Sequence, residues 1–290
     1  MKVIFKGKVL ITGLDGFTGT YVATALTNCA FECYGLNCNL LNSQGVIDRV
    51  LAVKPDYVLH LAGKSFAAEV DIASIYQSNV EGTLNLLDAL VKLTLPPKKV
   101  ILASSASVYG DSEYAPLNET MVPKPVSHYG CSKLSMEYMA EKYSDRLSLL
   151  MTRPFNYTGI GHSERFLIPK IIRAYKNRAS TIELGNLDVF REFNDVRDVA
   201  IIYARLLISK KAIGTVNICS GRSVSLSQVI KHMDVIADTN IDVISLDKFI
   251  RKNEISHLSG ATEKLQNMIR FNFEHSIEST LRWMYRSSVE

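Results

Sequence analysis

The stretch TGLDGFTG, residues 12–19, decides the fold that this chain can adopt. Its three glycines stand between an apolar run, KVLIT (8–12), and a segment whose apolar residues recur at helical spacing. A glycine turn between a strand and a helix lets backbone amides and the start of the helix approach a diphosphate, because no side chain blocks the way. The turn therefore predicts a dinucleotide-binding site beside the first strand.

Short runs rich in Val, Ile and Leu recur through the first half of the chain. DYVLHLA (56–62), KVILASS (99–105) and LSLLMTR (147–153) are almost continuously apolar, which is typical of strands buried on both faces of a parallel sheet. Between them, residues 74–93 place apolar side chains three and four positions apart, as on one face of a helix. This alternation predicts an α/β fold, a Rossmann-like doubly wound parallel sheet with helices on both sides.

The regular alternation weakens after about residue 157. We expect helices over 165–176 and 225–237, the second of them capped by a serine, and a strand at TIELG (181–185). A further strand over 214–219 is expected to return to the main sheet. The chain is thus predicted to hold an NAD(P)-binding domain over 1–156 and a smaller C-terminal α/β lobe over 157–290 that binds the substrate.

Composition excludes several classes of protein. The 290 residues are 47% hydrophobic, and 33 Lys and Arg nearly balance 29 Asp and Glu, so nucleic acid is not an expected partner. No run of 18 apolar residues predicts a membrane span, and Lys6 to Lys8 interrupt any signal sequence. Five cysteines without a CxxC pair or a zinc spacing favour a reducing compartment, the cytoplasm, and no metal site.

The segment ECYGLNCNLLN (32–42) bears on the choice of cofactor. An acidic residue after the second strand would favour NAD, because it binds the ribose hydroxyls, whereas an arginine would favour the 2′-phosphate of NADP. The end of this segment holds asparagines instead. NADP and NAD therefore both remain open, with NADP slightly favoured.

Tyr129 and Lys133, in YGCSK, are four residues apart and would share one face of a helix. A nearby ammonium favours the phenolate, so we expect the lysine to lower the tyrosine pKa from about 10 toward neutrality. The same spacing recurs nine residues later at Tyr138 and Lys142, and nine residues turn a helix by about half a revolution. Only one pair can face a site, and we assign the second pair to a solvated helix face.

SSASVYG (104–110) places three hydroxyls and a tyrosine where the apolar strand over 99–103 ends. Side chains at the carboxyl end of a strand in a doubly wound sheet face the ligand crevice. Ser105 is therefore expected to hydrogen-bond a substrate carbonyl while Tyr129 protonates it. The alternative is a serine that merely caps the following turn.

The motifs described above, with HLAG (60–63) and RPFN (153–156), occur in an order that resembles the extended short-chain dehydrogenase/reductase family of nucleotide-sugar epimerases, dehydratases and reductases. By this resemblance, Ser105, Tyr129 and Lys133 form the catalytic set around NAD(P). The resemblance also implies a set of cofactor contacts: Gly13, Gly16, Phe17, Thr18, Gly19, Asn39, Leu40, Leu61, Ala62, Gly63, Tyr129 and Lys133.

Within this family the chain is most similar to reductases of a GDP- or dTDP-linked 4-keto-6-deoxyhexose, on RPFNYTGIGHSERFLIPK (153–170), ELGNLDVFREFNDVRDV (183–199) and NICSG (217–221). Dehydratases carry an acidic pair where this chain has Ala106 and Ser107, which argues against elimination of water. The implied substrate contacts are Ser105, Ser107, Asn156, Lys170, Arg191, Arg251 and Glu254. For the two arginines, a surface ion pair is the alternative.

These expectations define a cytoplasmic NAD(P)H-dependent reductase that transfers a hydride to C4 of the sugar. The product would enter deoxysugar supply for surface polysaccharide such as O-antigen. A nucleotide-sugar 4-epimerase with retained NAD is the alternative within the enzyme class, and a non-catalytic cofactor-binding module is the alternative outside it. A homodimer is expected through the family alone.

Overall fold

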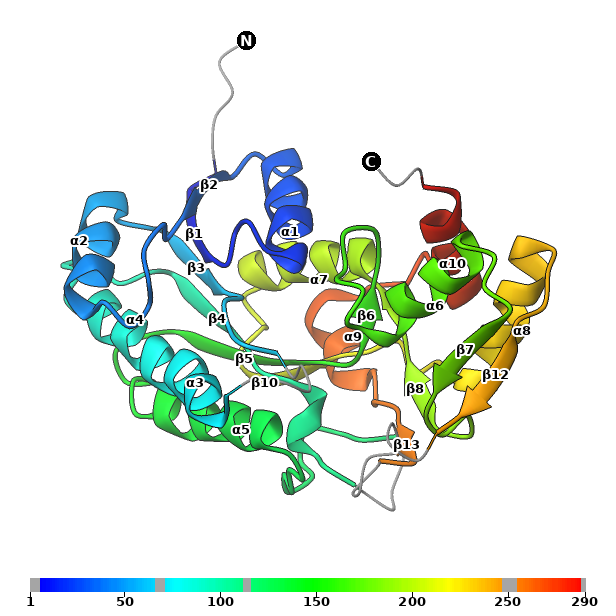
Figure 1. Ribbon diagram of the computed structural model, residues 1–290. Coiled ribbons are helices and arrows are strands. Elements are labelled where there is room, and N and C mark those ends of the chain that lie inside the picture. The colour runs from blue at the N-terminus through cyan, green and yellow to red at the C-terminus, as the bar shows by residue number, and fades with distance from the viewer. Residues whose placement is uncertain (1–5, 66–70, 112–115, 247–254, 288–290) are drawn as a thin grey trace, which may run out of the picture.

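The computed structural model describes residues 6–65, 71–111, 116–246 and 255–287. Its centre is a six-stranded parallel sheet with the order β10-β5-β4-β3-β1-β2 (Figure 1). The strands are β1 (Lys8–Thr12), β2 (Glu32–Gly35), β3 (Tyr57–His60), β4 (Lys99–Ala103), β5 (Leu149–Pro154) and β10 (Gly214–Ile218). This arrangement confirms the predicted Rossmann-like class, and the strand expected over 214–219 pairs in parallel with β5.

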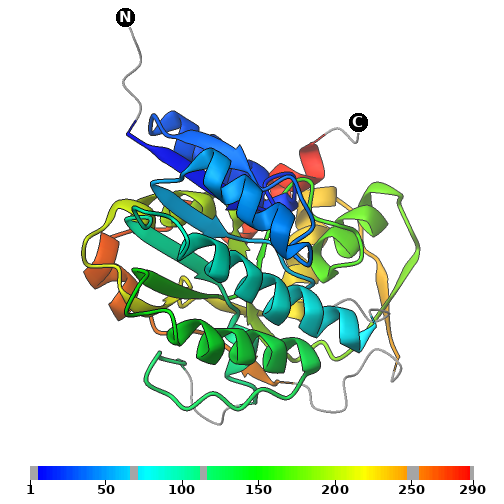
Figure 2. The same ribbon diagram turned by 90° about the vertical axis from the view of Figure 1, so that its left-hand side faces the viewer.

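Helices cover both faces of this sheet (Figure 1), and one of the two helical layers faces the viewer in Figure 2. Alternate residues of β1 show why, since Val9 and Ile11 point into one apolar core and Leu10 into the other. The first core is closed by α1 (Phe17–Asn28), α7 (Val196–Ile208) and α9 (Glu263–Ile269). The second is closed by α2 (Ser43–Val53), α4 (Gly82–Leu90) and α5 (His128–Glu141). Helices α7 and α9 show that the second half of the chain also builds the main layer.

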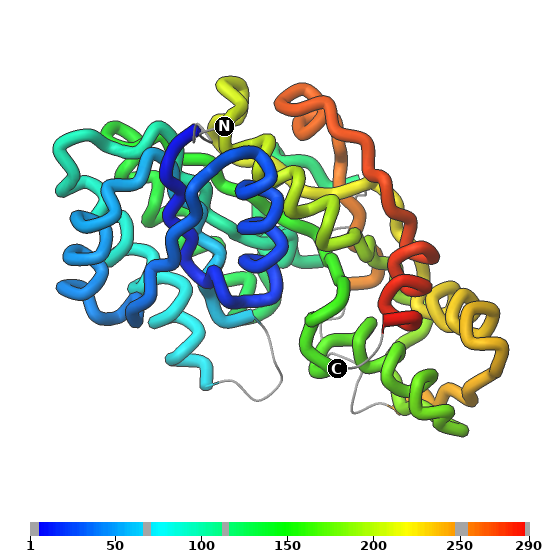
Figure 3. The backbone as a smooth tube through the Cα atoms, turned by 90° about the horizontal axis from the view of Figure 1, so that it is seen from above, coloured from blue at the N-terminus to red at the C-terminus, as the bar shows by residue number. Residues whose placement is uncertain are grey.

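The C-terminal lobe lies beside the sheet and has a core of its own (Figure 3). Its helices are α6 (Leu167–Lys176), α8 (Leu226–Ala237) and α10 (Ile277–Arg286). Its short strands form three small sheets: β7 (Thr181–Leu184) with β12 (Asp242–Ser245), β8 (Phe190–Glu192) with β11 (Ser223–Ser225) and β13 (His257–Leu258), and β6 (Tyr157–Thr158) with β9 (Asn194–Asp195). Ser225 caps α8 in a capping box with Gln228, as the sequence predicts.

The helix expected over 74–93 is interrupted. The chain forms α3 (Ile72–Tyr76), then a π-helical turn, η1 (Gln77–Glu81), and only then α4. A π turn inserts a residue into the helical repeat and is frequent at functional sites. Here it accompanies a buried asparagine, Asn79, whose side chain bonds both backbone groups of Lys64. None of the helices in the described ranges combines the length and apolar character needed to cross a membrane.

A polar residue, Asn217, lies in β10 one position before the strand ends, and it is fully buried. Its side-chain oxygen accepts the Tyr109 hydroxyl at 2.7 Å, and its amide donates to the Leu117 carbonyl at 2.9 Å. The backbone amide of the same residue donates to Glu119. Asn217 therefore joins the segment after β4 to the returning strand.

We expect Asn217→Ala to lower the free energy of unfolding by about 2 kcal/mol, because the buried Tyr109 hydroxyl would lose its acceptor on β10 and the Leu117 carbonyl would keep only the Ala261 amide. Urea unfolding measures this change. Thr215→Ala, on the same strand but half-buried, is the matched control and should cost less than about 1 kcal/mol. Equal losses in the two variants would contradict this role of Asn217.

Candidate active site

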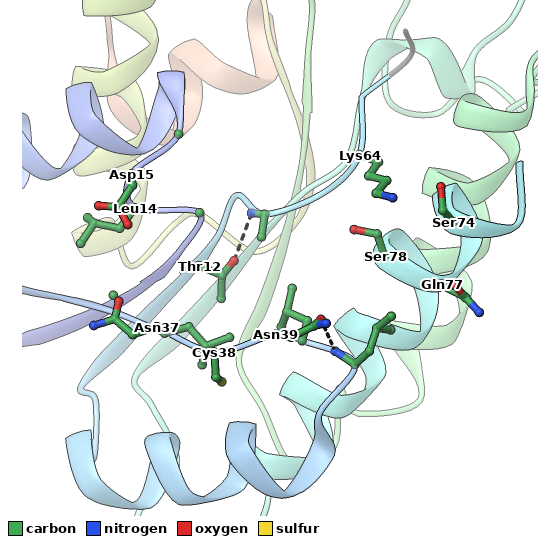
Figure 4. A pocket seen from close by; sticks show the side chains of 17 residues that line it. Thr12, Leu14, Asp15, Asn37, Cys38, Asn39, Lys64, Ser74, Gln77 and Ser78 are labelled. Atoms are coloured by element: carbon green, nitrogen blue, oxygen red, sulfur yellow. Dashed lines mark hydrogen bonds between the residues drawn. The ribbon is translucent and has the colours of Figure 1, made fainter. Parts of the chain in front are cut away.

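A cavity of about 430 Å³ opens at the carboxyl ends of β1 and β2, next to the glycine turn (Figure 4). Five of the predicted cofactor residues line it: Gly13, Gly16, Asn39, Leu40 and Ala62. Asp15 and Lys64 are the charged residues among the described lining, and Figure 4 shows them at different ends. Topology and position are those of a dinucleotide site at the edge of a doubly wound sheet.

The glycine turn fits a bound diphosphate for steric reasons. Gly13 has φ +71°, and a Cβ there would lie 3.1 Å from backbone atoms of Ala62. A Cβ at Gly19 would lie 2.1 Å from the Gly13 carbonyl oxygen, so only glycine allows α1 to start this close to the turn. Since α1 follows Gly16, which has no side chain to cap it, the first amides of the helix are available to an anion.

The side chains of Phe17 and Thr18 turn toward the segment after β5 rather than into the cavity. The Phe17 ring stacks on His162 with centroids 4.5 Å apart, and His162 stacks on Phe166 at 4.2 Å. Thr18 Oγ1 lies 2.8 Å from the Tyr157 hydroxyl. If these two residues contact the cofactor, they do so through backbone amides. The stack itself was missed, because aromatic residues 145 positions apart carry no local signal.

The structure brings Ser105, Tyr129 and Lys133 together from two elements. Ser105 follows β4, and its Oγ accepts the Ser107 amide at 3.1 Å, so it does cap the following turn. The same side chain also interacts with the phenol of Tyr129, which lies in the first turn of α5. Lys133, one turn later, donates from Nζ to the carbonyl oxygen of Ala103 at 2.8 Å. Ser105 therefore caps the turn and also contacts Tyr129, and its role toward a substrate stays a prediction.

The expectation that Lys133 lowers the pKa of Tyr129 is wrong for this structure. Burial raises the Tyr129 pKa to about 12, and the hydrogen bond with Ser105 offsets only part of that rise. The lysine ammonium is directed at the Ala103 carbonyl. Burial also lowers the pKa of Lys133 to about 8, against the opposing effect of the Glu137 carboxylate.

A buried ion pair supports α5, the helix that carries Tyr129 and Lys133. Arg153, the arginine of RPFN, donates from Nε and NH2 to the two carboxylate oxygens of Glu137, at 3.0 and 2.6 Å. Its guanidinium also lies over the Tyr109 ring, 4.9 Å from the centroid. Such a paired fork fixes geometry as well as charge. The pair holds α5, one turn beyond Lys133, against β5.

The second pair of the repeated spacing lies on a solvated face, as predicted. Tyr138 is 59% exposed, and Lys142 at the end of α5 is exposed too. Tyr138 therefore supplies a matched reference for Tyr129, the predicted proton donor.

Apart from Ser105 and Ser107 after β4, the predicted substrate residues are spread along the C-terminal half. Asn156 is exposed just after β5, and Ser107 is half-buried after β4. Arg191 donates to the Phe190 carbonyl at 2.8 Å, and Lys170 donates from Nζ to the Glu183 carbonyl at 2.7 Å. Arg251 and Glu254 lie outside the described residues. The substrate role of all these residues stays a prediction.

Arg49 is a cation that the sequence argument on cofactor choice overlooked. It lies on α2, fourteen residues after the end of β2, yet its Nε and NH2 donate to the Gly35 carbonyl at 3.0 and 2.8 Å. The described residues that follow β2 and line the cavity are neutral: Leu36, Asn37, Cys38 and Asn39. An arginine therefore does stand at the end of β2, although it comes from the next helix.

Comparison with known proteins agrees with this geometry. Residues 9–219 match the NAD dependent epimerase/dehydratase family. The chain belongs to this family. It is an extended short-chain dehydrogenase/reductase, an NAD(P)-dependent oxidoreductase, as its motifs predict.

Two curated relatives span nearly the whole chain. The GDP-6-deoxy-D-talose 4-dehydrogenase of Aggregatibacter actinomycetemcomitans is 33% identical over 288 residues, covering 97% of this chain and 98% of the relative. The GDP-6-deoxy-D-mannose reductase of Pseudomonas aeruginosa is 31% identical over 290 residues and covers 95% of each. Among solved structures, RMD from P. aeruginosa complexed with NADPH is 29% identical, with a TM-score of 0.89 over 97% of this chain and 98% of that one.

Two histidines of this region predict a pH dependence of stability. Burial lowers the pKa of His162 to about 4 and that of His60 to about 3. These rings stay neutral in the folded protein while the unfolded chain binds protons below about pH 6.5, so stability is lost as the pH falls below that value.

We expect His162→Phe, which keeps the aromatic stack, to reduce the loss of unfolding free energy between pH 6.5 and 5 by about 1–2 kcal/mol. Urea unfolding at the two pH values measures it. His128→Gln, at an exposed position, is the control and should leave the loss as in the wild type. An unchanged pH dependence in His162→Phe would show that this ring does not stay neutral.

Proposed function

We propose that this protein is an NAD(P)H-dependent reductase acting at C4 of a GDP-linked 4-keto-6-deoxyhexose. The observation that carries the proposal is the Ser105, Tyr129 and Lys133 set at the carboxyl end of β4, in a chain that aligns end to end with two enzymes named for GDP-6-deoxyhexoses. A dTDP-linked substrate has less support, because both of these relatives carry GDP in their names.

The geometry supports a different role for each of the three residues. When bound, NAD(P)H supplies the hydride that the carbonyl carbon accepts. Tyr129 gives its phenolic proton to the carbonyl oxygen, and its raised pKa suits this direction because the phenol stays protonated at neutral pH. Ser105 accepts the Ser107 amide, so its own hydroxyl proton can be directed to the same oxygen. Lys133 supplies positive charge one helical turn away.

NADPH is the proposed reductant rather than NADH. The cavity wall after β2 is neutral in the described residues, so it offers no carboxylate there for a ribose 2′-hydroxyl. Arg49 brings a guanidinium to the Gly35 carbonyl at the same strand end. The similar P. aeruginosa structure is a complex with NADPH.

A nucleotide-sugar 4-epimerase is the second candidate. The UDP-glucose 4-epimerase of Neisseria gonorrhoeae is 27% identical to this chain and covers 80% of it. An epimerase retains NAD and shows no net change in redox state. Protein purified with bound NAD and inert toward added NADPH would favour this candidate.

We further propose that the enzyme works in the cytoplasm as a homodimer and supplies a deoxysugar for surface polysaccharide such as O-antigen. The five described cysteines are unpaired thiols, which fits a reducing compartment. Both full-length relatives named above act, by their names, on activated 6-deoxyhexoses.

The proposed function is tested by mixing the protein with NADPH or NADH and freshly prepared GDP- or dTDP-4-keto-6-deoxymannose, while nicotinamide fluorescence is followed. We expect consumption of NADPH with the GDP sugar. The product's configuration at C4 is then read by NMR, since 6-deoxy-talose and 6-deoxy-mannose differ there. Absence of consumption with every pair would reject the reductase and favour the epimerase.

We expect Tyr129→Phe to lower kcat by roughly 10²–10⁴-fold, because the carbonyl oxygen loses its proton donor. Binding of NADPH, followed by fluorescence titration, should change little. Tyr138→Phe removes the same hydroxyl from the exposed pair on the same helix and should keep full activity. Comparable activity in the two variants would remove Tyr129 from the proposed chemistry.

A further inference from the structure

A buried histidine, His60, connects the glycine turn to the helices on the other side of β3. Its Nδ1 lies 2.7 Å from Thr12 Oγ1, and its Nε2 lies 2.9 Å from Thr83 Oγ1. All three residues are at most 1% exposed. Thr12 ends β1 and lines the cofactor cavity, whereas Thr83 lies in α4. The imidazole itself is not part of the cavity wall, so it cannot act by touching a ligand there.

The direction of each hydrogen bond follows from the neighbours of the ring. The Thr83 hydroxyl gives its only proton to the Asn79 carbonyl at 2.8 Å, so it must accept from His60, and Nε2 carries the proton. The ring is neutral at physiological pH, since burial lowers its pKa to about 3. Nδ1 therefore accepts from the Thr12 hydroxyl, whose oxygen accepts the Ala62 amide at 3.1 Å (Figure 4).

The far end of this chain of bonds reaches the catalytic helix. The side-chain amide of Asn79 donates to Ser132 Oγ at 3.0 Å, and Ser132 Oγ donates to the backbone carbonyl of Tyr129 at 2.8 Å. The same asparagine accepts the Lys64 amide at 2.9 Å and donates to the Lys64 carbonyl at 3.1 Å. A Cβ at neighbouring Gly63 would lie 2.8 Å from Asn79 Oδ1 and 3.1 Å from Lys133 Nζ, which shows how tightly these groups pack.

We infer that His60, as its Nε2–H tautomer, is a positioning residue that sets the catalytic helix α5 relative to the cofactor cavity. Hydrogen bonds run from the Ala62 amide through Thr12, His60 and Thr83 to the Asn79 backbone carbonyl, and continue from the Asn79 side-chain amide through Ser132 to the Tyr129 carbonyl. Both ends bear on function, because Ala62 lines the cavity and Tyr129 is the proton donor of the proposed reaction, on which this inference rests. Because the neutral ring has one donor and one acceptor, every hydrogen bond in this series donates in the same direction, from Ala62 toward Tyr129.

A merely structural role would lower stability without changing turnover by the folded enzyme, so the test separates the two. We expect His60→Phe, which keeps a ring but removes both bonds, to lower kcat about tenfold or more, because small displacements of reacting groups are costly. The KM for the sugar nucleotide should stay within about twofold. His60→Gln, which restores a donor and an acceptor, should recover most of kcat.

Thr83→Val removes the next hydroxyl in this series of hydrogen bonds. It replaces His60→Phe as the test variant if His60→Phe does not fold. Thr152→Val is the matched control, because Thr152 is also fully buried and its hydroxyl lies 3.1 Å from Tyr203, outside the chain. We expect the kcat loss in Thr83→Val and not in Thr152→Val. A kcat within twofold of the wild type in folded His60→Phe or Thr83→Val, or no recovery in His60→Gln, would overturn the inference.

Hydrogen exchange of the apo protein tests the inference without any substrate. In His60→Phe and Thr83→Val, amides of α5 should exchange about tenfold faster than in the wild type, with little change in α7 on the opposite face of the sheet. An equal rise in both helices, or none, would mean that the ring does not position α5. If the wild type reduces no sugar nucleotide, the proposed function fails, while this measurement still decides the role of His60.

Discussion

The first helix can begin where it does only because residue 19 has no Cβ. An added Cβ would lie 2.1 Å from the carbonyl oxygen of Gly13 and 2.5 Å from that of Leu14. This close approach brings the start of α1 against the end of β1, where the cavity opens. The aromatic stack begins from Phe17 on one side of this turn, and the hydrogen bonds of His60 begin from Thr12 on the other. The cavity, the aromatic stack toward the C-terminal lobe and the hydrogen bonds that lead toward α5 all meet at this turn.

Burial governs the proton chemistry of the site. It disfavours charge on every group, so it raises the pKa of Tyr129 to about 12 and lowers that of Lys133 to about 8. The two values approach each other from opposite sides, and the phenol remains the form present at neutral pH. An enzyme working in the direction of reduction needs that form. The Glu137 carboxylate, held by Arg153, helps the lysine to keep its charge in a buried place.

Local patterns in the sequence were sufficient to predict the strands of the main sheet, the glycine turn and the helix that carries Tyr129 and Lys133, because each depends on neighbours within a few residues. They could not predict the π turn at Asn79, which stands where the apolar spacing reads as one continuous helix. Arg49 was overlooked because its partner at Gly35 lies on another element. The pKa of Tyr129 was predicted with the wrong sign, since spacing shows that a lysine is near and not where its ammonium points.

Because β10 returns to the main sheet from late in the sequence, the sheet cannot be completed early in synthesis. When the first 156 residues have left the ribosome, β5 still has one unpaired edge, because its partner β10 begins only at Gly214. The apolar face later covered by α7 is also bare at that stage. Exposed edges and apolar faces of this kind invite pairing with other chains. We therefore expect chaperones to bind the exposed edge and apolar face of the nascent N-terminal half until about sixty further residues have emerged.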